Sequence, residues 1–357
     1  MKKMKIGILA GTGMVGQKYI QLLENHPWFE VTYIAASERS AGKRYGEAVQ
    51  GRWHLSTALS TEVAEIKVSK MSEITECKKQ CRFVFSALGS GPANEWEEKY
   101  AEAGIPVVSN ASTHRHDKDV PMIIPEINSK HLKIIPIQQK NRNWETGFIA
   151  VKPNCSLQSY ITPLFALHQK FTLKRAIITT LQAVSGAGYP GVSSYDMIDN
   201  VIPFISGEEE KSEFEPKKIL GKIIGNEIVP NNTFQISVHC NRVPVIDGHL
   251  ATVSVDFEEK PNRGEIINIW NNFRGISQDY NLPFAPKQTI IYREEPDRPQ
   301  PKLDRDSGNG MAVTVGRLRE GNVFQYRFTG LSHNTVRGAA GGGILNAELL
   351  VKEGYIK

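Results

Sequence analysis

The sequence predicts an α/β protein with an N-terminal Rossmann-type, doubly wound parallel sheet and a second, α+β domain with a mixed sheet. Over roughly the first 150 residues, short β-branched runs alternate with amphipathic helical segments, which is typical of a parallel sheet. A glycine-rich turn follows the first of these runs, as in nucleotide-binding folds. Later strand-like runs follow one another directly, which favours a mixed or antiparallel sheet. We place the domains at 1–153 and 154–333 and expect a C-terminal helix at 334–357 to complete the first.

The elements of the first domain follow from hydrophobic periodicity, which is two residues in strands and 3.6 in helices. Buried strands are predicted at Lys5–Leu9, Val31–Ala36, Phe83–Ala87 and Pro106–Ser109. Two segments between them, Met14–Leu23 and Asn94–Ala103, have the spacing of amphipathic helices. This order predicts strand–helix–strand crossovers.

The second domain is predicted to be richer in strands. These lie at Ala176–Ala183, Phe234–Val245, Leu250–Phe257, Gly310–Arg317 and Val323–Leu331. From Asn334 to about Lys352 we predict a helix opened by an Asn cap. Its Gly/Ala-rich start weakens the helix but allows close packing against another backbone or a cofactor.

Composition excludes several classes of protein. The chain has 357 residues, a net charge of +5 and a pI near 8.8, with scattered basic residues, so no nucleic-acid partner is expected. Four cysteines in a chain of this length do not form a disulfide framework. Cys77 and Cys81 lack a second pair with zinc-ligand spacing, as do His114 and His116, so no metal is expected.

The sequence also indicates where the protein works. No stretch is long and apolar enough to span a bilayer, so no membrane partner is expected. The start, Met1–Lys5, is basic and precedes apolar residues, as in a signal peptide. Glycines from Gly7 onward interrupt that run, and no small-residue cleavage pattern follows. We therefore expect a cytoplasmic protein.

A glycine-rich turn joins the first predicted strand to the first predicted helix. It consists of Gly11, Thr12, Gly13, Met14, Val15 and Gly16. Glycines let a backbone approach a pyrophosphate, whose charge is stabilised by the N–H groups of the helix N-terminus. The motif predicts a dinucleotide site, and the alternative is a tight turn of an α/β fold without a nucleotide.

The end of the second predicted strand indicates which dinucleotide is bound. An NAD site usually has an acidic residue there for the ribose 2′-hydroxyl. Glu38 is present, but Ser37, Arg39 and Ser40 surround it with donors suited to a 2′-phosphate. We predict NADP rather than NAD. The alternative for Arg39 is a solvated loop charge.

Cys155 is the candidate nucleophile. The segment Pro153–Ser156 is predicted to deliver it to the first turn of a buried helix, whose partial positive charge would lower the thiol pKa. The alternative is a small buried hydrophobic residue. Cys240 is a rival nucleophile, but it lies inside a predicted strand with no helix N-terminus behind it.

A nucleophilic cysteine needs a proton shuttle and a site for the developing oxyanion. His249 is the candidate shuttle, because it follows a strand and the turn Asp247–Gly248 and is expected at a sheet end. The alternative is a structural histidine, which is the commoner role of a lone histidine at a strand end.

Taken together, the motifs resemble aspartate-semialdehyde dehydrogenase, particularly its archaeal and fungal branch, nearly from end to end. The motifs are Ser37–Lys43, Ser109–Ser112, Pro153–Cys155, Gln182–Tyr189, Gly207–Lys211, Asn241–Val243 with His249, Arg298–Pro301 and His333–Gly341. So many motifs in one order are more specific than any one of them. One departure is local: Ala10 stands where the family has its first glycine, and Gly11 where it has alanine.

The resemblance implies NADPH-dependent reductive dephosphorylation of L-aspartyl 4-phosphate to L-aspartate 4-semialdehyde through a Cys155 thioester. The pathways implied are those to lysine and diaminopimelate, threonine, methionine and isoleucine. His249 would be the general acid/base, with Asn154 and Gln182 beside the reacting carbonyl. The implied cofactor-binding residues also include Ser185, Gly186 and Asn334. The family forms homodimers or homotetramers, and nothing in the sequence fixes the number.

Substrate chemistry supports four further assignments. Arg242 suits the α-carboxylate, because a guanidinium matches two oxygens, and Glu208 suits the α-ammonium. Lys211 and Arg115 suit the phosphate. The alternatives are an exposed helical ion pair for Glu208 and Lys211, and a loop charge for Arg115.

Three other functions fit parts of the pattern. N-acetylglutamyl-phosphate reductase and malonyl-CoA reductase use the same thioester chemistry. The first has no substrate amine to pair with Glu208, and the second has a long CoA tail and no transferable phosphate for Lys211. A nucleotide-sensing protein without catalysis would bind NADPH and have an unreactive Cys155.

Overall fold

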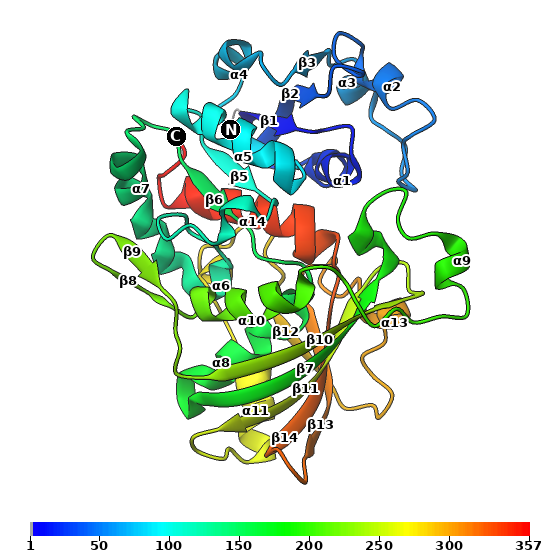
Figure 1. Cartoon of the computed structure of the whole chain (residues 1–357), viewed down its shortest axis with the longest axis vertical. Coiled ribbons are helices and arrows are strands. Elements are labelled where there is room, and N and C mark those ends of the chain that lie inside the picture. Colours follow the sequence, from blue (N-terminus) through cyan, green and yellow to red (C-terminus); the bar gives the residue numbers. More distant parts are fainter. Residues whose placement is uncertain (1–2) are drawn as a thin grey trace.

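The computed structural model describes residues 3–357 and confirms the predicted fold class. Met1 and Lys2, the start of the basic N-terminal stretch, lie outside the described residues. Two six-stranded sheets dominate the fold, one at the top and one at the bottom of Figure 1. Within the described residues, no helix is long and apolar enough to cross a membrane.

The first sheet is entirely parallel, with strand order β3-β2-β1-β4-β5-β6. Its strands are β1 (Met4–Leu9), β2 (Phe29–Ala36), β3 (Val68–Lys70), β4 (Phe83–Ser86), β5 (Val107–Ser109) and β6 (Ile149–Val151). All four strands predicted in this region are present. β3 and β6 were not predicted, because three residues are too few to show a periodicity.

Helices connect the successive strands of this sheet. They are α1 (Met14–Leu23), α2 (Tyr45–Ala48), α3 (Thr61–Ala64), α4 (Ile74–Gln80), α5 (Ser90–Glu102), α6 (Pro125–Asn128) and α7 (Ile135–Arg142). α1 and α5 confirm the two helices predicted here. The strand order reverses direction between β1 and β4, and such a switch point forms a crevice where the carboxyl ends of the strands meet.

The second sheet is mixed, with strand order β10-β7-β11-β14-β13-β12. Its strands are β7 (Leu173–Ala183), β10 (Gln235–Val243), β11 (His249–Phe257), β12 (Ile290–Arg293), β13 (Val313–Glu320) and β14 (Tyr326–Ser332). β10 pairs parallel with β7 and β12 with β13, whereas the pairs formed by β11 and β14 are antiparallel. The short strand β12 was not predicted. A separate hairpin is formed by β8 (Lys222–Ile224) and β9 (Glu227–Val229).

Helices α8 (Ile161–Phe171) and α11 (Arg263–Asn272) pack together against this sheet, and the indole N–H of Trp270 donates to the Pro163 carbonyl between them. α10 (Glu208–Ile219) lies beside β10. The remaining helices are the short α9 (Ser194–Met197), α12 (Ile276–Asp279) and α13 (Pro301–Asp304).

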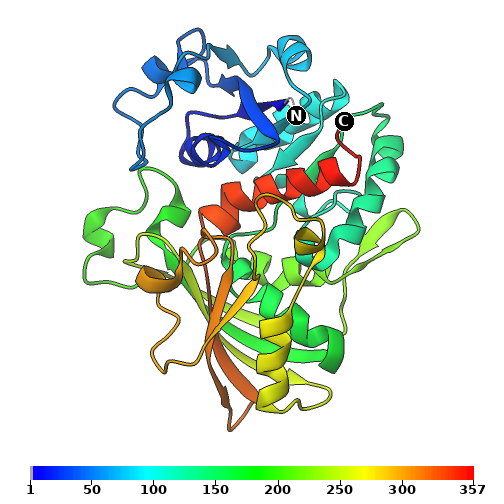
Figure 2. The same cartoon turned by 180° about the vertical axis from the view of Figure 1, so that it is seen from behind.

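The C-terminal helix begins later than predicted. Asn334 does not cap it; a π-type turn, Val336–Ala340, precedes α14 (Gly341–Lys352). Figures 1 and 2 show α14, coloured red, between the two sheets. A Cβ built on Gly343 would clash with the Tyr19 hydroxyl of α1, so this glycine lets α14 pack closely against a side chain, where the sequence predicted a backbone or a cofactor.

Candidate active site

The glycine-rich turn lies between β1 and α1, at the carboxyl end of the sheet. The N-cap residue of α1 is Gly13, which supplies no side-chain cap, so first-turn N–H groups stay available to an anion. A Cβ on Gly16 would lie 2.6 Å from the Ala10 carbonyl oxygen, and a Cβ on Gly11 would lie 2.5 Å from Cγ2 of Ile34. The turn therefore requires both glycines, and its conformation fits a pyrophosphate.

The departure at Ala10 has a structural cost. Ala10 has a φ of 57°, in the left-handed region that favours glycine. Glycine is needed at the next position, Gly11, because a Cβ there would collide with the Ile34 side chain. Relative to the family pattern, the swap of alanine and glycine at positions 10 and 11 preserves the turn but places strain on Ala10.

The residues predicted to bind the 2′-phosphate directly follow β2, which ends at Ala36. Ser37, Glu38 and Arg39 are exposed, and Glu38 pairs with Lys70 at 3.2 Å. Ser40 is buried, and its hydroxyl has no hydrogen-bond partner among the described residues. The acidic side chain is thus turned toward a lysine, and the hydroxyl and guanidinium donors remain for a ligand.

Cys155 lies at the amino end of a 3-10 helix, Ser156–Ser159, and α8 starts only at Ile161. Its Sγ is 3.4 Å from Nε2 of His249, which is the first residue of β11. The two residues are 94 positions apart in the sequence, and the fold brings them together as predicted.

The predicted low pKa of the Cys155 thiol is wrong for the free protein. The pKa of this thiol is raised to about 11, by burial first and by the nearby Glu208 carboxylate second. The positive charges of Lys152, Arg115 and Arg242 act in the opposite direction and do not offset that rise. A single 3-10 turn has a smaller dipole than an α-helix, and it does not offset the loss of solvent.

His249 is held in one tautomer. The backbone N–H of Ala183 donates to its Nδ1 at 3.0 Å, so Nε2 carries the proton of the neutral ring and points at the sulfur. Burial, together with the nearby positive charges of Arg242 and Lys152, lowers the pKa of His249 to about 3. The imidazole is therefore a neutral hydrogen-bond donor in this arrangement.

Glu208 is the centre of a second group of predicted residues. Its carboxylate accepts hydrogen bonds from Nδ2 of Asn154 at 2.9 and 3.0 Å and from Nζ of Lys211 at 3.0 Å. Nε2 of Gln182 donates to it at 3.4 Å. Because Glu208 is only 9% exposed, the exposed helical ion pair is excluded.

Arg242 and the residues predicted at the cofactor surround His249. Nη1 of Arg242 donates to the Ala183 carbonyl at 2.7 Å, and a Cβ on Gly186 would lie 2.9 Å from that nitrogen and 3.1 Å from the imidazole. The Asn334 side chain accepts from the N–H of Gly248 and donates to the Ser185 hydroxyl, both at 2.8 Å. Asn334 thus fixes the turn before His249.

Arg115 is buried rather than a loop charge. Its Nη1 donates to the Glu215 carboxylate at 2.8 Å and its Nη2 to the Asn110 carbonyl at 2.9 Å. Glu215 was not predicted, nor was Lys218, which donates to the carbonyls of Arg115 and Asp117. Their spacing of seven and ten residues from Glu208 on one helix is the signal that could have identified them.

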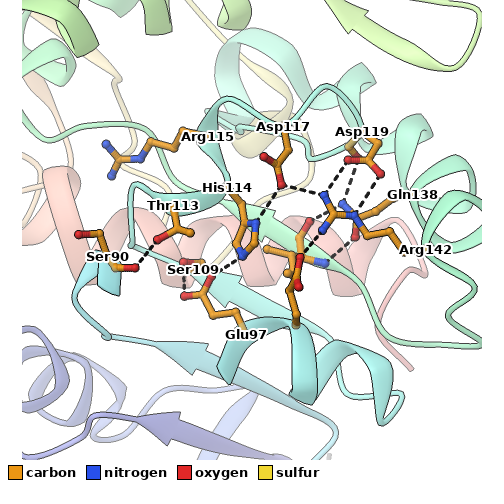
Figure 3. A network of polar contacts seen from close by, with 12 residues as sticks. Ser90, Glu97, Ser109, Thr113, His114, Arg115, Asp117, Asp119, Gln138 and Arg142 are labelled. Carbon is orange, nitrogen blue, oxygen red and sulfur yellow. Dashed lines mark hydrogen bonds and ion pairs between the residues drawn. The ribbon is translucent and has the colours of Figure 1, made fainter. Parts of the chain in front are cut away.

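A polar network holds the loop that carries Arg115 (Figure 3). Nδ1 of His114 lies 2.9 Å from the Asp117 carboxylate, and Arg142 donates to Asp117 at 2.7 Å. The hydrogen bonds to His114 and Arg142 together lower the pKa of Asp117 to about 2. Figure 3 shows the Arg115 side chain pointing away from this network, so it does not take part in these contacts.

Among residues 3–357, no group of three or more His, Cys, Asp and Glu side chains is arranged to hold a metal ion. The polar groups of the site are instead paired with one another and with backbone atoms.

Comparison with known proteins identifies the family. Residues 5–135 match the family model described as semialdehyde dehydrogenase, NAD binding domain, and residues 164–337 match the model described as semialdehyde dehydrogenase, dimerisation domain. The aspartate-semialdehyde dehydrogenase of Archaeoglobus fulgidus is 48% identical over 98% of this chain and 99% of its own. That of Schizosaccharomyces pombe is 44% identical over 99% of both.

Two further relatives bear on the chemistry. A malonyl CoA reductase (NADP) of Metallosphaera sedula is 40% identical over 99% of both chains. The crystal structure of aspartate semialdehyde dehydrogenase with NADP from Candida albicans matches with a TM-score of 0.91 and 40% identity, over 99% of this chain and 100% of that one. The chain therefore belongs to the aspartate-semialdehyde dehydrogenase family, a family of NAD(P)-binding dehydrogenases of amino-acid biosynthesis.

Proposed function

We propose that the protein catalyses the NADPH-dependent reduction of L-aspartyl 4-phosphate to L-aspartate 4-semialdehyde and phosphate, through a thioester on Cys155. This step would serve the synthesis of lysine and diaminopimelate, threonine, methionine and isoleucine. The observation that carries the proposal is the convergence of Cys155, His249 and the Glu208–Lys211 pair on one buried site.

The glycine-rich turn supports an NADP site. Its free N–H groups at α1 would hold the pyrophosphate, and Ser37, Arg39 and Ser40 would hold the 2′-phosphate. Ser185, Gly186 and Asn334, beside His249, would contact the nicotinamide end. The bound cofactor supplies the hydride. The Candida albicans relative with NADP supports this choice.

Four charged residues would bind the two ends of the substrate. The Arg242 guanidinium would pair with the α-carboxylate and the Glu208 carboxylate with the α-ammonium. Lys211 and Arg115 would bind the phosphate. Each of these side chains is buried or half-buried, so its charge acts with little screening by water.

The first half of the reaction belongs to Cys155. Its sulfur bonds to the acyl carbon, the carbon–oxygen bond to phosphate breaks, and the thiol proton leaves with the phosphate. Asn154 and Gln182 lie beside this carbonyl and are predicted to donate to its oxyanion, after their amides exchange Glu208 for the substrate.

The second half consumes one proton. Hydride from the bound cofactor would add to the thioester carbon, the carbon–sulfur bond would break to release the aldehyde, and the thiolate left on Cys155 would take up a proton from solvent, which restores the thiol. The tautomer of His249 supports its assistance as a donor to the oxyanion, through Nε2–H, more than as a base that removes the thiol proton.

We also propose the division into domains 1–153 and 154–333, with 334–357 completing the first, and a homodimer or homotetramer. The match of residues 164–337 to a dimerisation domain supports assembly between copies of the chain. The proposed location is the cytoplasm.

The proposal is tested with L-aspartate 4-semialdehyde, phosphate and either NADP⁺ or NAD⁺. We expect phosphate-dependent reduction of the dinucleotide, coupled to oxidation of the semialdehyde, that is faster with NADP⁺ than with NAD⁺. Cys155→Ala should bind NADPH, measured by fluorescence, and show no turnover; retained turnover would exclude the thioester.

The relative named malonyl CoA reductase makes that activity the second candidate. NADPH oxidation with malonyl-CoA, and none with aspartyl phosphate, would favour it. The pairing of Glu208 with Lys211 argues against it, because malonyl-CoA has neither an ammonium group nor a transferable phosphate.

A further inference from the structure

One face of α10 supplies buried charges to the site. Glu208, Lys211, Glu215 and Lys218 are spaced by three, four and three residues, so they lie along one side of the helix. Glu215 is 0% exposed and Lys218 is 2% exposed. Buried charges are costly unless each has partners, so the contacts of Glu215 indicate what it does.

Glu215 joins two parts of the site that are distant in sequence. Its Oε2 accepts the backbone N–H of Asn154 at 2.6 Å, beside the nucleophile, and its Oε1 accepts Nη1 of Arg115 at 2.8 Å. These partners are 61 and 100 residues away along the chain. A single rigid carboxylate thus sets the position of the arginine relative to Cys155.

The arginine has little freedom on its other sides. Nη2 donates to the Asn110 carbonyl, and Nζ of Lys218 donates to the Arg115 carbonyl at 2.8 Å and to the Asp117 carbonyl at 2.6 Å. Nε of Arg115 is buried without a hydrogen-bond partner among the described residues. The guanidinium therefore keeps unused donors while Glu215 fixes its plane.

We infer that Glu215 is a positioning residue that sets the distance between the phosphate-binding arginine and the nucleophile. The inference rests on the proposed function, in which Arg115 holds the phosphate. Glu215 does not touch the substrate; it acts through Arg115 and through the Asn154 N–H. Displacement of a positioned group by about 1 Å can cost on the order of 100-fold in rate, so the expected effect is large.

Glu215→Gln separates the two contacts. An amide oxygen can still accept the Asn154 N–H, but the amide NH₂ then faces the Arg115 guanidinium, donor against donor. Cys155 should therefore keep its position, whereas the Arg115 guanidinium should be displaced. Glu213→Gln is the matched control, because Glu213 lies on the same helix and accepts the Val238 N–H at 3.1 Å without contacting the site.

The oxidation of L-aspartate 4-semialdehyde gives two readouts. Without phosphate, wild-type protein should form about one NADPH per site in a burst, which reports on Cys155 and hydride transfer. With phosphate, the steady-state KM for phosphate reports on Arg115. For Glu215→Gln we expect a retained burst and a phosphate KM raised at least tenfold, whereas Glu213→Gln should match the wild type in both.

Two results would overturn the inference: a phosphate KM of Glu215→Gln within twofold of Glu213→Gln, or equal losses of burst and phosphate affinity. A double variant with Arg115→Met adds a further test, since a residue that acts through Arg115 should add nothing to its loss, and additive losses would contradict the coupling. If Glu215→Gln does not fold, Glu215→Asp keeps the charge and should still raise the phosphate KM; a wild-type KM there would overturn the inference. A wild-type protein without phosphate dependence would instead refute the proposed function.

Discussion

The rate of Cys155 alkylation in the free protein should climb with pH and show no plateau near neutrality. Burial raises the pKa of this thiol to about 11, compared with an ordinary value of 9.0. The thiolate is the reactive form, and its fraction at pH 7 is 10^(7−11), or about 10⁻⁴, against about 10⁻² for an ordinary thiol. Because the pKa lies above the whole working range, the rate should rise about tenfold per pH unit and about 100-fold from pH 7 to pH 9.

The assay is timed iodoacetamide labelling of the free protein followed by mass spectrometry of the cysteine peptides, with Cys155→Ala as the control for the other thiols. Glu208→Gln should shift the curve to lower pH, because the Glu208 charge is one cause of the raised pKa. A labelling rate that is already constant between pH 7 and pH 9 would refute the reasoning and restore a thiolate stabilised by the helix terminus.

Three further outcomes are expected. Arg39→Ala should raise the KM for NADP⁺ about tenfold and leave that for NAD⁺ nearly unchanged, because a charge-assisted hydrogen bond to the 2′-phosphate is lost; equal changes for both would argue against that contact. Gly16→Ala should lower both NADPH affinity, measured by fluorescence titration, and the melting temperature, since its Cβ would lie 2.6 Å from the Ala10 carbonyl oxygen; binding and melting like the wild type would contradict the turn geometry. Ala10→Gly should raise the free energy of unfolding by about 1 kcal/mol by relieving the positive φ, measured by urea denaturation, and a decrease would show that no strain is stored there.

The two large sheets could be predicted from the sequence because most of their strands are long enough to show alternation, whereas only the longer helices, such as α1 and α5, have enough residues to show an apolar face. β3, β6, β8, β9 and β12 escaped prediction because strands of three or four residues contain about two alternations. The Asn334 cap was wrong because its side chain bonds to Gly248 and Ser185, partners that no local pattern reveals. Tertiary contacts decided the role of Asn334.

The site was predictable to the extent that its chemistry resides in single residue types. Cys155 and His249 were identified from turn and strand context, and the structure places them 3.4 Å apart. Glu215 was missed because it lies in a charge-rich stretch that is typical of a solvated helix face. The raised thiol pKa was missed for a related reason: burial depends on what the rest of the chain packs over Cys155, and local sequence does not contain it.

The segment that follows Asn334 has a consequence for the life of the newly made chain. A Cβ on Gly338 would lie 2.9 Å from Cβ of Cys155, so this late segment forms the wall behind the sulfur, and Asn334 secures the turn that aims the imidazole. Ribosomes make these residues after both Cys155 and His249. Until the segment 334–340 has been made, the nucleophile lies in an unfinished pocket, so the reactive pair is assembled only once this segment has packed against it.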